Sequence, residues 1–575
     1  MRTGKWLAGW AIALGVITSA PWLSAYLTGV LLQIEMPLPW WRAWWAYYQH
    51  IHDPLYAPYA WRIWLAGGLG AGVPLLAGAM ALGLLVRAPA KTLHGSARFA
   101  SNRDLARQGM FRRSPTALVI GRRGRRLVHM SGQQFAILAA PTRSGKGVGI
   151  VVPNLLSYEG SVVVLDIKQE NFDLTSGWRK AQGQDVYLFN PFAEDLRTAR
   201  WNPLHYVSDG VFRISDIMAL AETLYPDGAG EQGFWVSQAR NAFVAFTMFL
   251  FERDDAQAGG SRLQSSREPT LGEVFRISTG DGDDLKAYLQ GLAAQPFLSG
   301  ITQNAFANLL SQAEDTFASI MGTFREPLNM FLNPVLDAAT SGNDFLLTDV
   351  RKKKMTIYIG IQPNKLAESR IIINMFFSQL VKLNTRELPA QNTALRHQCL
   401  LLMDEFTAMG RVDILASAVS FIAGYNLRLL PIIQSLSQLD AVYGPDTARS
   451  FVTNHALQIV YTPREQRDAN DYSEMLGYTT VRQKNVTRGQ GVSVSHSDER
   501  RALMLPQELK AMSPDKEVFL YEGIPHPVMA DKIRYYQDRY FTRRLLPKVE
   551  VPKIAIRHAR GEQKKARSIH MEERR

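Results

Sequence analysis

The stretch that decides the fold is Phe135-Ala-Ile-Leu-Ala-Ala-Pro-Thr-Arg-Ser-Gly-Lys-Gly147. An apolar run of strand type leads into a glycine-containing loop and then into a helix-compatible segment, which is the context a phosphate-binding loop requires. Backbone N–H groups around Gly145 can surround a β-phosphate, the helix points its positive end at the same place, and Lys146 reaches the γ-phosphate. The alternative is a glycine-rich turn with a solvated lysine. We therefore predict an ATP site made by Pro141, Thr142, Arg143, Ser144, Gly145, Lys146 and Gly147.

Two positions in this loop depart from the usual pattern. Ala140 replaces the first glycine, and Gly147 replaces the Ser or Thr whose hydroxyl normally holds Mg²⁺. We therefore expect Mg²⁺ to rely on Asp404 and on water, with a hydroxyl of Thr142 or Ser144 as a further ligand.

A second motif, Leu400-Leu-Leu-Met-Asp-Glu405, is an apolar run that ends in two acids. Such a strand places both carboxylates at the carboxyl edge of an open α/β sheet, where ligands bind. We expect Asp404 to hold Mg²⁺ and Glu405 to act as the general base on a water molecule. Two exposed acids that cap the following helix are the alternative. At the end of another apolar run, Gln434 offers an amide for the γ-phosphate or the attacking water.

Short β-type runs alternate with longer helical ones after residue 90, which is typical of a parallel sheet covered by helices. Uninterrupted apolar runs, such as the one at 399–403, suit strands buried on both faces. The sequence thus predicts an α/β fold with strands at 135–139, 162–166, 186–189, 356–361, 399–403, 428–433, 457–461 and 518–521.

Two uncharged apolar stretches, 6–34 and 63–86, precede this region. Each exceeds the ~20 residues needed to span a hydrocarbon core, so both are predicted transmembrane helices. The loop 35–62 between them carries a cluster of Trp and Tyr residues that suits a membrane interface. A cleaved signal peptide is the alternative for the first stretch.

Basic residues flank both stretches: Arg2 and Lys5 precede the first, and Arg87, Lys91 and Arg98 follow the second. By the positive-inside rule, both chain termini are expected in the cytoplasm and the loop in the periplasm. The segment 87–126 holds eleven basic residues against one acid, so we expect it to lie under anionic membrane lipids, with a solvated linker as the alternative.

Composition limits the partners and the compartment. The formal net charge is +13 and the sequence pI is near 9.6, which favours polyanionic partners such as nucleic acid or anionic lipid. The single cysteine, Cys399, cannot form an intramolecular disulfide, so the bulk of the chain suits the reducing cytosol. No His-Glu-x-x-His or Leu-Ser-Gly-Gly-Gln stretch occurs, which argues against a zinc protease and a cassette-type exporter.

Three further motifs, taken with the two nucleotide motifs, resemble the type IV secretion coupling proteins, which are ATPases of bacterial conjugation and related export. They are Leu93-His-Gly-Ser-Ala-Arg-Phe99, Asp166-Ile-Lys-Gln-Glu170 and Trp201-Asn-Pro-Leu204. The resemblance implies a RecA-like P-loop domain interrupted by an all-α domain and anchored in the inner membrane. It also implies a homo-hexamer that hydrolyses ATP between neighbours and serves single-stranded DNA, a relaxase or relaxosome, and the components of a secretion channel.

Helix-spaced apolar residues at 211–252 and 301–339 agree with an inserted helical domain. Trp235 lies on a helical face there and is expected in the core, with base stacking as the alternative. We predict loops at 254–268 and 483–501 because both stretches are polar and contain glycine. The expected parts are an anchor (1–90), a nucleotide-binding domain in two pieces (91–205 and 346–546), an all-α insertion (206–345) and a basic, disordered tail (547–575).

A ring of this kind needs a basic finger from the adjacent subunit, for which Arg411 and Arg428 are candidates by position. Lys168 and Glu170 are expected near the nucleotide, with a solvated strand end as the alternative. Two functions remain open. One is an ATP-driven motor that moves DNA toward a secretion channel. The other is a nucleotide-switched docking receptor for protein effectors, which the missing hydroxyl at Gly147 would suit.

Overall fold

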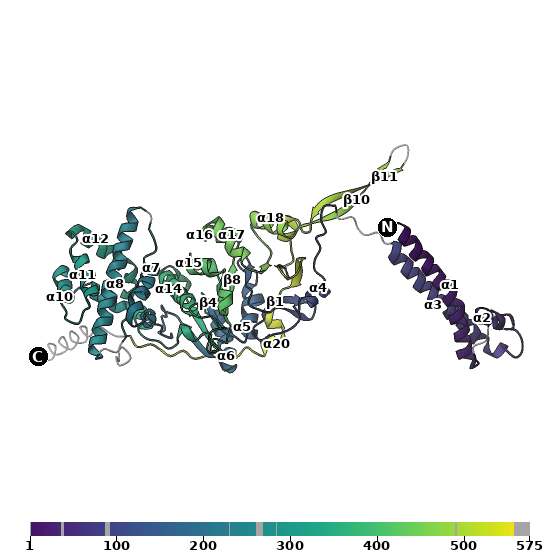
Figure 1. The fold of residues 1–575 in the computed structure, drawn as a ribbon, viewed down its shortest axis with the longest axis horizontal. Coiled ribbons are helices and arrows are strands. Elements are labelled where there is room, and N and C mark those ends of the chain that lie inside the picture. The colour runs from purple at the N-terminus through teal and green to yellow at the C-terminus, as the bar shows by residue number, and fades with distance from the viewer. Residues whose placement is uncertain are drawn as a thin grey trace. The chain divides into compact units, whose positions relative to one another are not determined.

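A computed structural model describes residues 2–35, 39–86, 93–228, 230–259, 268–282, 284–488 and 492–556 of the chain. The chain divides into two compact units, Met1–Leu93 and His94–Arg575. The first contains helices alone in its described part, whereas the second contains a large sheet with its covering helices (Figure 1).

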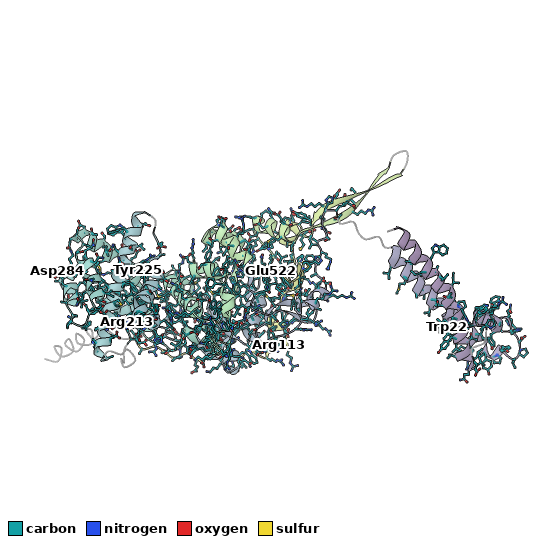
Figure 2. The ribbon with its side chains drawn as sticks, viewed as in Figure 1. Trp22, Arg113, Arg213, Tyr225, Asp284 and Glu522 are labelled. Atoms are coloured by element: carbon teal, nitrogen blue, oxygen red, sulfur yellow. The ribbon has the colours of Figure 1, made fainter. Side chains whose placement is uncertain are left out.

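The first unit is a pair of long apolar helices, α1 (Arg2–Leu32) and α3 (Ala60–Val86), joined through α2 (Trp40–Gln49) and the short turn η1 (Ala57–Tyr59). Within them, Ala8–Leu32 and Ala57–Leu84 are long and apolar enough to cross a membrane. Trp22 of α1 is labelled in Figure 2 and lies on the exposed outer side of the pair.

The predicted aromatic loop contains helix α2, which packs back onto the two long helices. The indole N–H of Trp44 donates to the carbonyl of Ile63 at 2.8 Å, and the ring of Tyr48 stacks on Trp44 with a centroid separation of 5.1 Å. Arg62 donates to the carbonyl of Leu31 at 2.9 Å, which ties the ends of the long helices together. The loop is therefore ordered by its amphipathic aromatic residues.

The second unit is built around an 11-stranded sheet with the order β2-β1-β13-β12-β9-β3-β8-β7-β4-β6-β5. From β9 to β5 the seven strands are parallel, while β12 joins β9 antiparallel and carries β13, β1 and β2 beyond it. The strands are β1 (Leu118–Arg123), β2 (Arg126–Met130), β3 (Ala136–Ala139), β4 (Ser161–Asp166), β5 (Asp185–Phe189), β6 (Met355–Gly360), β7 (Cys399–Met403), β8 (Leu427–Ile433), β9 (Leu457–Val460), β12 (Lys516–Tyr521) and β13 (Val528–Asp531).

All eight predicted strands are present, and the central ones are buried on both faces. In β4, Val163 and Leu165 contribute to the hydrophobic core on one face of the sheet, while Val162 and Val164 contribute to the core on the other. This two-sided burial explains why the sequences of these strands are continuous apolar runs. The helices associated with the sheet are α4 (Asn102–Arg107), α5 (Val152–Ser157), α6 (Glu170–Ala181), α14 (Leu366–Asn384), α15 (Asp413–Ala418), α16 (Leu436–Tyr443), α17 (Pro445–Thr453), α18 (Gln466–Met475), α19 (Pro506–Lys510) and α20 (Arg539–Thr542).

Short helical turns connect several of these elements. They are η2 (Gly147–Val151), η3 (Pro203–Tyr206), η4 (Gly210–Phe212), η6 (Glu326–Leu332), η7 (Leu347–Asp349), η8 (Pro363–Lys365), η9 (Phe406–Met409), η10 (Ile422–Tyr425) and η11 (Tyr535–Gln537).

Between β5 and β6 the described chain forms helices and turns without a strand, and these helices gather at one end of the unit (Figure 1). Their core is aromatic: Phe246 stacks on Phe324 at 5.2 Å, and the hydroxyl of Tyr225, a residue labelled in Figure 2, donates to the carbonyl of Phe324 at 2.7 Å. Trp235 packs against this core, as predicted. The helices are α7 (Arg213–Leu224), α8 (Glu231–Gln257), α9 (Leu271–Ser278), α10 (Leu285–Ala293), α11 (Gly300–Leu310), α12 (Glu314–Arg325) and α13 (Pro334–Ala339).

One predicted loop inside this helical segment is only partly a loop. Helix α8 continues to Gln257, so the first residues of the predicted loop 254–268 are helical. Residues 260–267 lie outside the described part of the chain. The domain limits drawn from the sequence stay a prediction.

The predicted loop at 483–501 is wrong, because this segment belongs to a β-hairpin. Strand β10 (Tyr478–Arg488) pairs antiparallel with β11 (Val492–Ala502), from Tyr478 opposite Ala502 to Arg488 opposite Val492. The hairpin extends from the end of the unit opposite the helical segment (Figure 1). The two strands pair with each other, and the described side chains at 478–483 and 497–501 are exposed or only partly buried, so the local sequence carries little of the apolar pattern of a core strand.

The motif at residues 93–99 lies at the base of this hairpin. Ser96 pairs with Thr479, and the N–H of Ala97 donates to the carbonyl of Tyr478 at 3.0 Å. Gly95 has a φ of +128°, and a Cβ at this position would overlap the carbonyl oxygen of Tyr478. The glycine of the motif is thus required by a close backbone approach.

The disorder predicted for 547–575 is wrong for its described part, which ends at residue 556. Arg197 pairs with Lys553, the N–H of Ile554 donates to the carbonyl of Leu196 at 2.9 Å, and the side chains of Val551 and Ile554 are buried. These apolar residues attach the segment next to the β5 edge of the sheet. Residues 557–575 lie outside the described part of the chain.

Candidate nucleotide site

The predicted phosphate loop follows β3, in the middle of the parallel part of the sheet. The N–H of Ala140 donates to the carbonyl of Ile433 on β8, and the N–H of Tyr461 donates to the carbonyl of Ala139, both at 2.9 Å. The loop then turns through left-handed backbone at Arg143 (φ 62°) and Gly145 (φ 88°). It continues directly into η2 and α5, so a helical N-terminus faces the loop.

The acids at the end of β7 meet the lysine of the loop. The ammonium nitrogen of Lys146 lies 3.5 Å from a carboxylate oxygen of Asp404 and forms a closer ion pair with Glu405. The three side chains are between 12% and 22% exposed, so they interact where solvent screening is weak. Glu405 adopts left-handed backbone (φ 58°), which is costly for a side chain of this type and is most often retained at functional sites.

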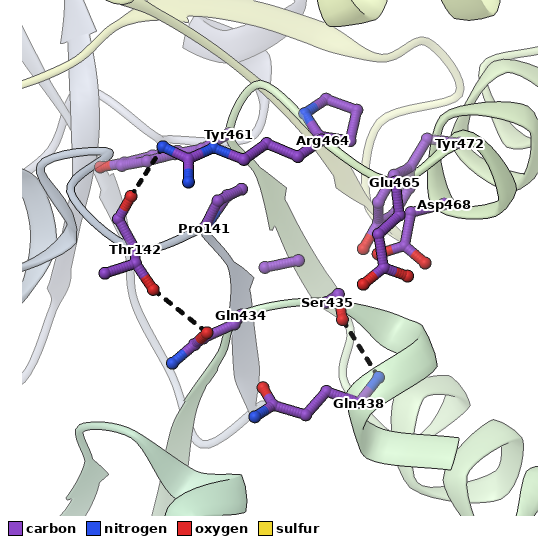
Figure 3. A pocket seen from close by; sticks show the side chains of 12 residues that line it. Pro141, Thr142, Gln434, Ser435, Gln438, Tyr461, Arg464, Glu465, Asp468 and Tyr472 are labelled. Atoms are coloured by element: carbon purple, nitrogen blue, oxygen red, sulfur yellow. Dashed lines mark hydrogen bonds between the residues drawn. The ribbon is translucent and has the colours of Figure 1, made fainter. Parts of the chain in front are cut away.

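Gln434 connects the phosphate loop to the second motif. Its amide nitrogen donates to a carboxylate oxygen of Glu405 at 2.8 Å. Its amide oxygen accepts a hydrogen bond from the hydroxyl of Thr142 at 3.1 Å (Figure 3). The structure therefore brings together residues from the carboxyl ends of β3, β7 and β8, as the sequence predicted.

The pKa values of the two acids are shifted in opposite directions. Burial raises the pKa of Asp404, helped by the neighbouring charge of Glu405 and opposed by Lys146. Burial also pushes the pKa of Glu405 upward, but hydrogen bonds from Lys146 and Gln434 and the charges of Lys146 and Lys168 outweigh it and hold this pKa below its usual value. Glu405 is thus ionised at neutral pH and can accept a proton. Lys168 is close enough to influence it, as expected.

A third acid of the site, Asp166, lies near Asp404 at the end of β4. Burial raises the pKa of Asp166 to about 7, although its carboxylate accepts hydrogen bonds from the side chain of Asn171 at 3.1 Å and from the N–H of Phe172 at 2.8 Å. Asn171 also contacts Asp404. Asp166 belongs to the motif Asp166–Glu170, whereas Asn171 lies one residue beyond that motif and was not predicted to be part of the site.

The buried hydroxyl of Ser144 makes no hydrogen bond to the described residues, while the buried ammonium of Lys146 and the Asp404 oxygen nearest to it are engaged only with the charged groups of the site. Buried polar groups are almost always paired in folded proteins, so the Ser144 hydroxyl beside this ion-pair cluster fits a polar ligand that supplies phosphate oxygens and a cation. Gly147 offers no hydroxyl, and the described part of the chain has no cluster of three His, Cys, Asp or Glu residues that could hold a metal by itself. This donor set suits Mg²⁺ bound mainly through phosphates and water.

A cavity of about 300 Å³ adjoins the loop on the side of β9 (Figure 3). Among its lining residues, Arg464 donates to the backbone carbonyl of Thr142 at 3.0 Å. Lys532, which follows β13, donates to the carbonyl of Ser144 at 3.3 Å. Neither Arg464 nor Lys532 belongs to a motif that the sequence marks. The only local signal is that each basic residue follows the end of a strand.

One of the two candidates for a basic finger is excluded. Arg428 is fully buried in β8, and its guanidinium donates to the backbone carbonyls of Gln134, Thr116 and Met130 at 2.8 to 3.1 Å. It is a structural arginine, so its assignment as a finger is wrong. Arg411 is exposed and pairs with Asp413, which leaves it as a candidate.

The fold and this constellation define a RecA-like P-loop protein. The profile of the family described as "Type IV secretory system Conjugative DNA transfer" matches residues 91–558, so the chain belongs to this family.

The similar proteins agree with this assignment. The chain is 32% identical to Protein VirD4 of Rhizobium radiobacter, over 72% of this chain and 58% of that protein. It is 27% identical to the conjugal transfer protein TraG of Escherichia coli, over 81% of this chain and 79% of that protein. The chain therefore spans less than two thirds of the VirD4 relative.

Solved structures show the same fold. The bacterial conjugative coupling protein TrwBdeltaN70 superposes with a TM-score of 0.56 at 17% identity, over 82% of this chain and 97% of that one. The plasmid coupling protein TrwB in complex with ADP and Mg²⁺ superposes with a TM-score of 0.54 at 17% identity.

Proposed function

We propose that this protein is an inner-membrane coupling ATPase that brings DNA or nucleoprotein to a type IV secretion channel and drives its transfer by hydrolysing ATP. The observation that carries the proposal is the meeting of Lys146, Asp404, Glu405 and Gln434 at one edge of the sheet. A lysine on a phosphate loop, two acids and an amide at the adjacent strand ends are the parts that nucleotide hydrolysis needs.

Each residue has a role that follows from its position. The N–H groups of the loop 141–147 and the ammonium of Lys146 bind the phosphates. Asp404 and the Ser144 hydroxyl would hold Mg²⁺ together with water, and the bound ion would supply neutralising charge at the phosphates. Glu405 orients the attacking water and takes its proton, because it is ionised and its second oxygen is fixed by Gln434.

The ion pairs of Lys146 also suggest how binding proceeds. Its ammonium contacts Asp404 and Glu405 and has no further acceptor among the residues described. Arriving phosphates offer the lysine stronger acceptors, so the lysine moves toward them and releases Glu405 to face water. Gln434 holds Glu405 in place during this exchange.

The remaining parts of the proposal rest on the family and on charge. The two apolar helices anchor the chain in the inner membrane, and the positive charge attracts single-stranded DNA, held through its phosphates without sequence preference. A homo-hexamer, a relaxase or relaxosome and channel components are the expected partners. VirD4 and TraG relatives and the TrwB structures support this proposal.

The test is ATP hydrolysis by the full-length protein in detergent, with and without single-stranded DNA. Lys146→Ala should abolish nucleotide binding, and Glu405→Gln should abolish hydrolysis but keep binding. Lys516→Met, which breaks an ion pair with Asp531 on the neighbouring strands, serves as a folded control. Hydrolysis that rises with DNA and disappears in both site variants supports the motor.

A second outcome would favour the docking receptor. If the wild-type protein binds nucleotide but shows no hydrolysis that responds to DNA, the motor proposal fails. Nucleotide would then act as a conformational switch for recruiting protein substrates, and Gly147 would explain the weak turnover.

A further inference from the structure

Two basic side chains that follow other strands of the sheet donate hydrogen bonds to backbone carbonyls of the phosphate loop. The guanidinium of Arg464 donates to the carbonyl of Thr142 at 3.0 Å, and the ammonium of Lys532 donates to the carbonyl of Ser144 at 3.3 Å. Arg464 follows β9 and Lys532 follows β13, so both lie on the side of the loop away from Asp404 and Glu405. The loop therefore has acids on one side and cations on the other.

These two contacts act on alternate peptide units of the loop. A trans peptide points its C=O and its N–H in opposite directions, because the unit is planar. Fixing the carbonyl of Thr142 outward therefore turns the N–H of Arg143 inward, and fixing that of Ser144 does the same for Gly145. Neither N–H has an acceptor among the described residues, and Arg143 and Gly145 are the two residues of the loop with positive φ.

Lys532 packs against buried residues, in contrast to a typical surface lysine. Its ammonium lies 3.7 Å from the centre of the Tyr461 ring, and that ring is fully buried. The hydroxyl of Tyr461 faces Gly149 of η2 so closely that a Cβ there would overlap it. Burial lowers the pKa of Lys532 to about 8, so the side chain remains charged at neutral pH. The lysine, the tyrosine ring and the helix after the loop form one packed unit.

We propose that Lys532 and Arg464 are positioning residues that hold the phosphate loop open for an anion by turning the N–H groups of Gly145 and Arg143 toward the phosphates. The inference rests on the proposed nucleotide site and adds residues to it. Neither side chain touches the phosphates in this arrangement. Their effect is on the affinity for the nucleotide, through the direction of two backbone donors.

The experiment compares binding of a fluorescent ADP analogue with Mg²⁺ to the full-length protein in detergent. Lys532→Met and Arg464→Gln should each weaken binding by about tenfold, since each removes one charge-assisted hydrogen bond that orders the loop. The KM for ATP should rise by a similar factor, while kcat at saturating ATP should change little. Lys532→Arg should recover much of the affinity, because it keeps a cationic donor at the same place.

Matched controls separate positioning from general effects of charge and folding. Lys516→Met removes a lysine from the adjacent strand β12, and Arg467→Gln removes an arginine from α18 that pairs with Asp440. Both should bind nucleotide like the wild type. Arg464 is exposed at the surface, so Arg464→Gln tests the idea even if Lys532→Met lowers the melting temperature.

The outcomes distinguish this inference from the proposed function. If Arg464→Gln and Lys532→Met bind the nucleotide as tightly as their control variants do, the inference is overturned. Loss of nucleotide binding in Lys146→Ala would still support the nucleotide site in that case. A fall in kcat with unchanged affinity would also overturn it. Absence of nucleotide binding by the wild type would overturn both.

Discussion

The side-chain amide nitrogen of Gln434 lies 2.8 Å from a carboxylate oxygen of Glu405, although 29 positions separate the two residues in the sequence. They follow strands β8 and β7, which are neighbours in the parallel sheet. The hydrogen bond fixes the plane of the carboxylate and leaves its other oxygen on the side of Lys146. This contact gives the proposed base a single orientation.

Gln434→Ala is expected to lower kcat for ATP by on the order of 100-fold, because Glu405 loses the donor that orients it. Affinity for the nucleotide should change much less, since the loop and Lys146 are intact. Steady-state hydrolysis together with binding of a fluorescent nucleotide measures both quantities. Gln466→Ala, on the exposed surface of α18, is the control. A variant with normal kcat would show that the amide has no part in the reaction.

Arg428→Met is expected to destabilise the protein and not to act selectively on catalysis. The substitution leaves three backbone carbonyls without their donor, and each buried carbonyl that stays unpaired costs roughly 1–3 kcal/mol. The melting temperature of the purified protein should fall clearly. Arg411→Met should leave it unchanged, because that side chain is exposed. Normal stability of Arg428→Met would contradict its structural role.

Acid should destabilise the protein through His455. This side chain is fully buried, its Nδ1–H donates to the backbone carbonyl of Phe451 at 2.7 Å, and burial lowers its pKa to about 4. Because the unfolded chain binds a proton below its usual pKa near 6.5, stability is complete above that pH and falls as pH decreases toward 4. The loss amounts to about 3 kcal/mol.

The variant His455→Asn cannot titrate in this range. Its melting temperature should therefore fall less between pH 7.5 and pH 5 than that of the wild type. An equal fall in both proteins would assign the acid sensitivity to other groups.

Gly95→Ala should loosen the base of the hairpin, because the new Cβ overlaps the carbonyl of Tyr478 and φ is +128°. The pairing of Ser96 with Thr479 is then lost, and limited trypsin digestion should cut near Arg482 sooner than in the wild type. Gly291→Ala, where a Cβ meets no atom within 4 Å, is the control. Unchanged cleavage would show that the motif does not secure the hairpin.

The local sequence was sufficient to predict the strands that are buried on both faces of the sheet. The run ending at Met403 has no polar residue because β7 is covered on both sides, so its place in a parallel sheet could be predicted. The placement of Lys146, Asp404, Glu405 and Gln434 at one edge follows from the same rule. Parallel strands that end in polar residues bring them together.

Contacts between distant segments could not be predicted in this way. Arg428 resembles an interruption in an apolar strand until the carbonyls of residues 116–134 are placed around it. The hairpin β10–β11 is stabilised by pairing of two polar strands, a feature that no local pattern reports. The roles of Arg464 and Lys532 depend on strands that join the sheet far from the loop in sequence.

The order of the strands also has a consequence for how the protein is made. Strand β3 emerges from the ribosome long before β8 and β9, the neighbours between which it lies, and before Lys532, which holds the loop from outside. The phosphate loop therefore cannot take its final shape during most of translation, while the two apolar helices are synthesised first. The proposed nucleotide site is therefore completed only when the chain has been made as far as Lys532, whereas both candidate membrane-spanning helices are complete by residue 86.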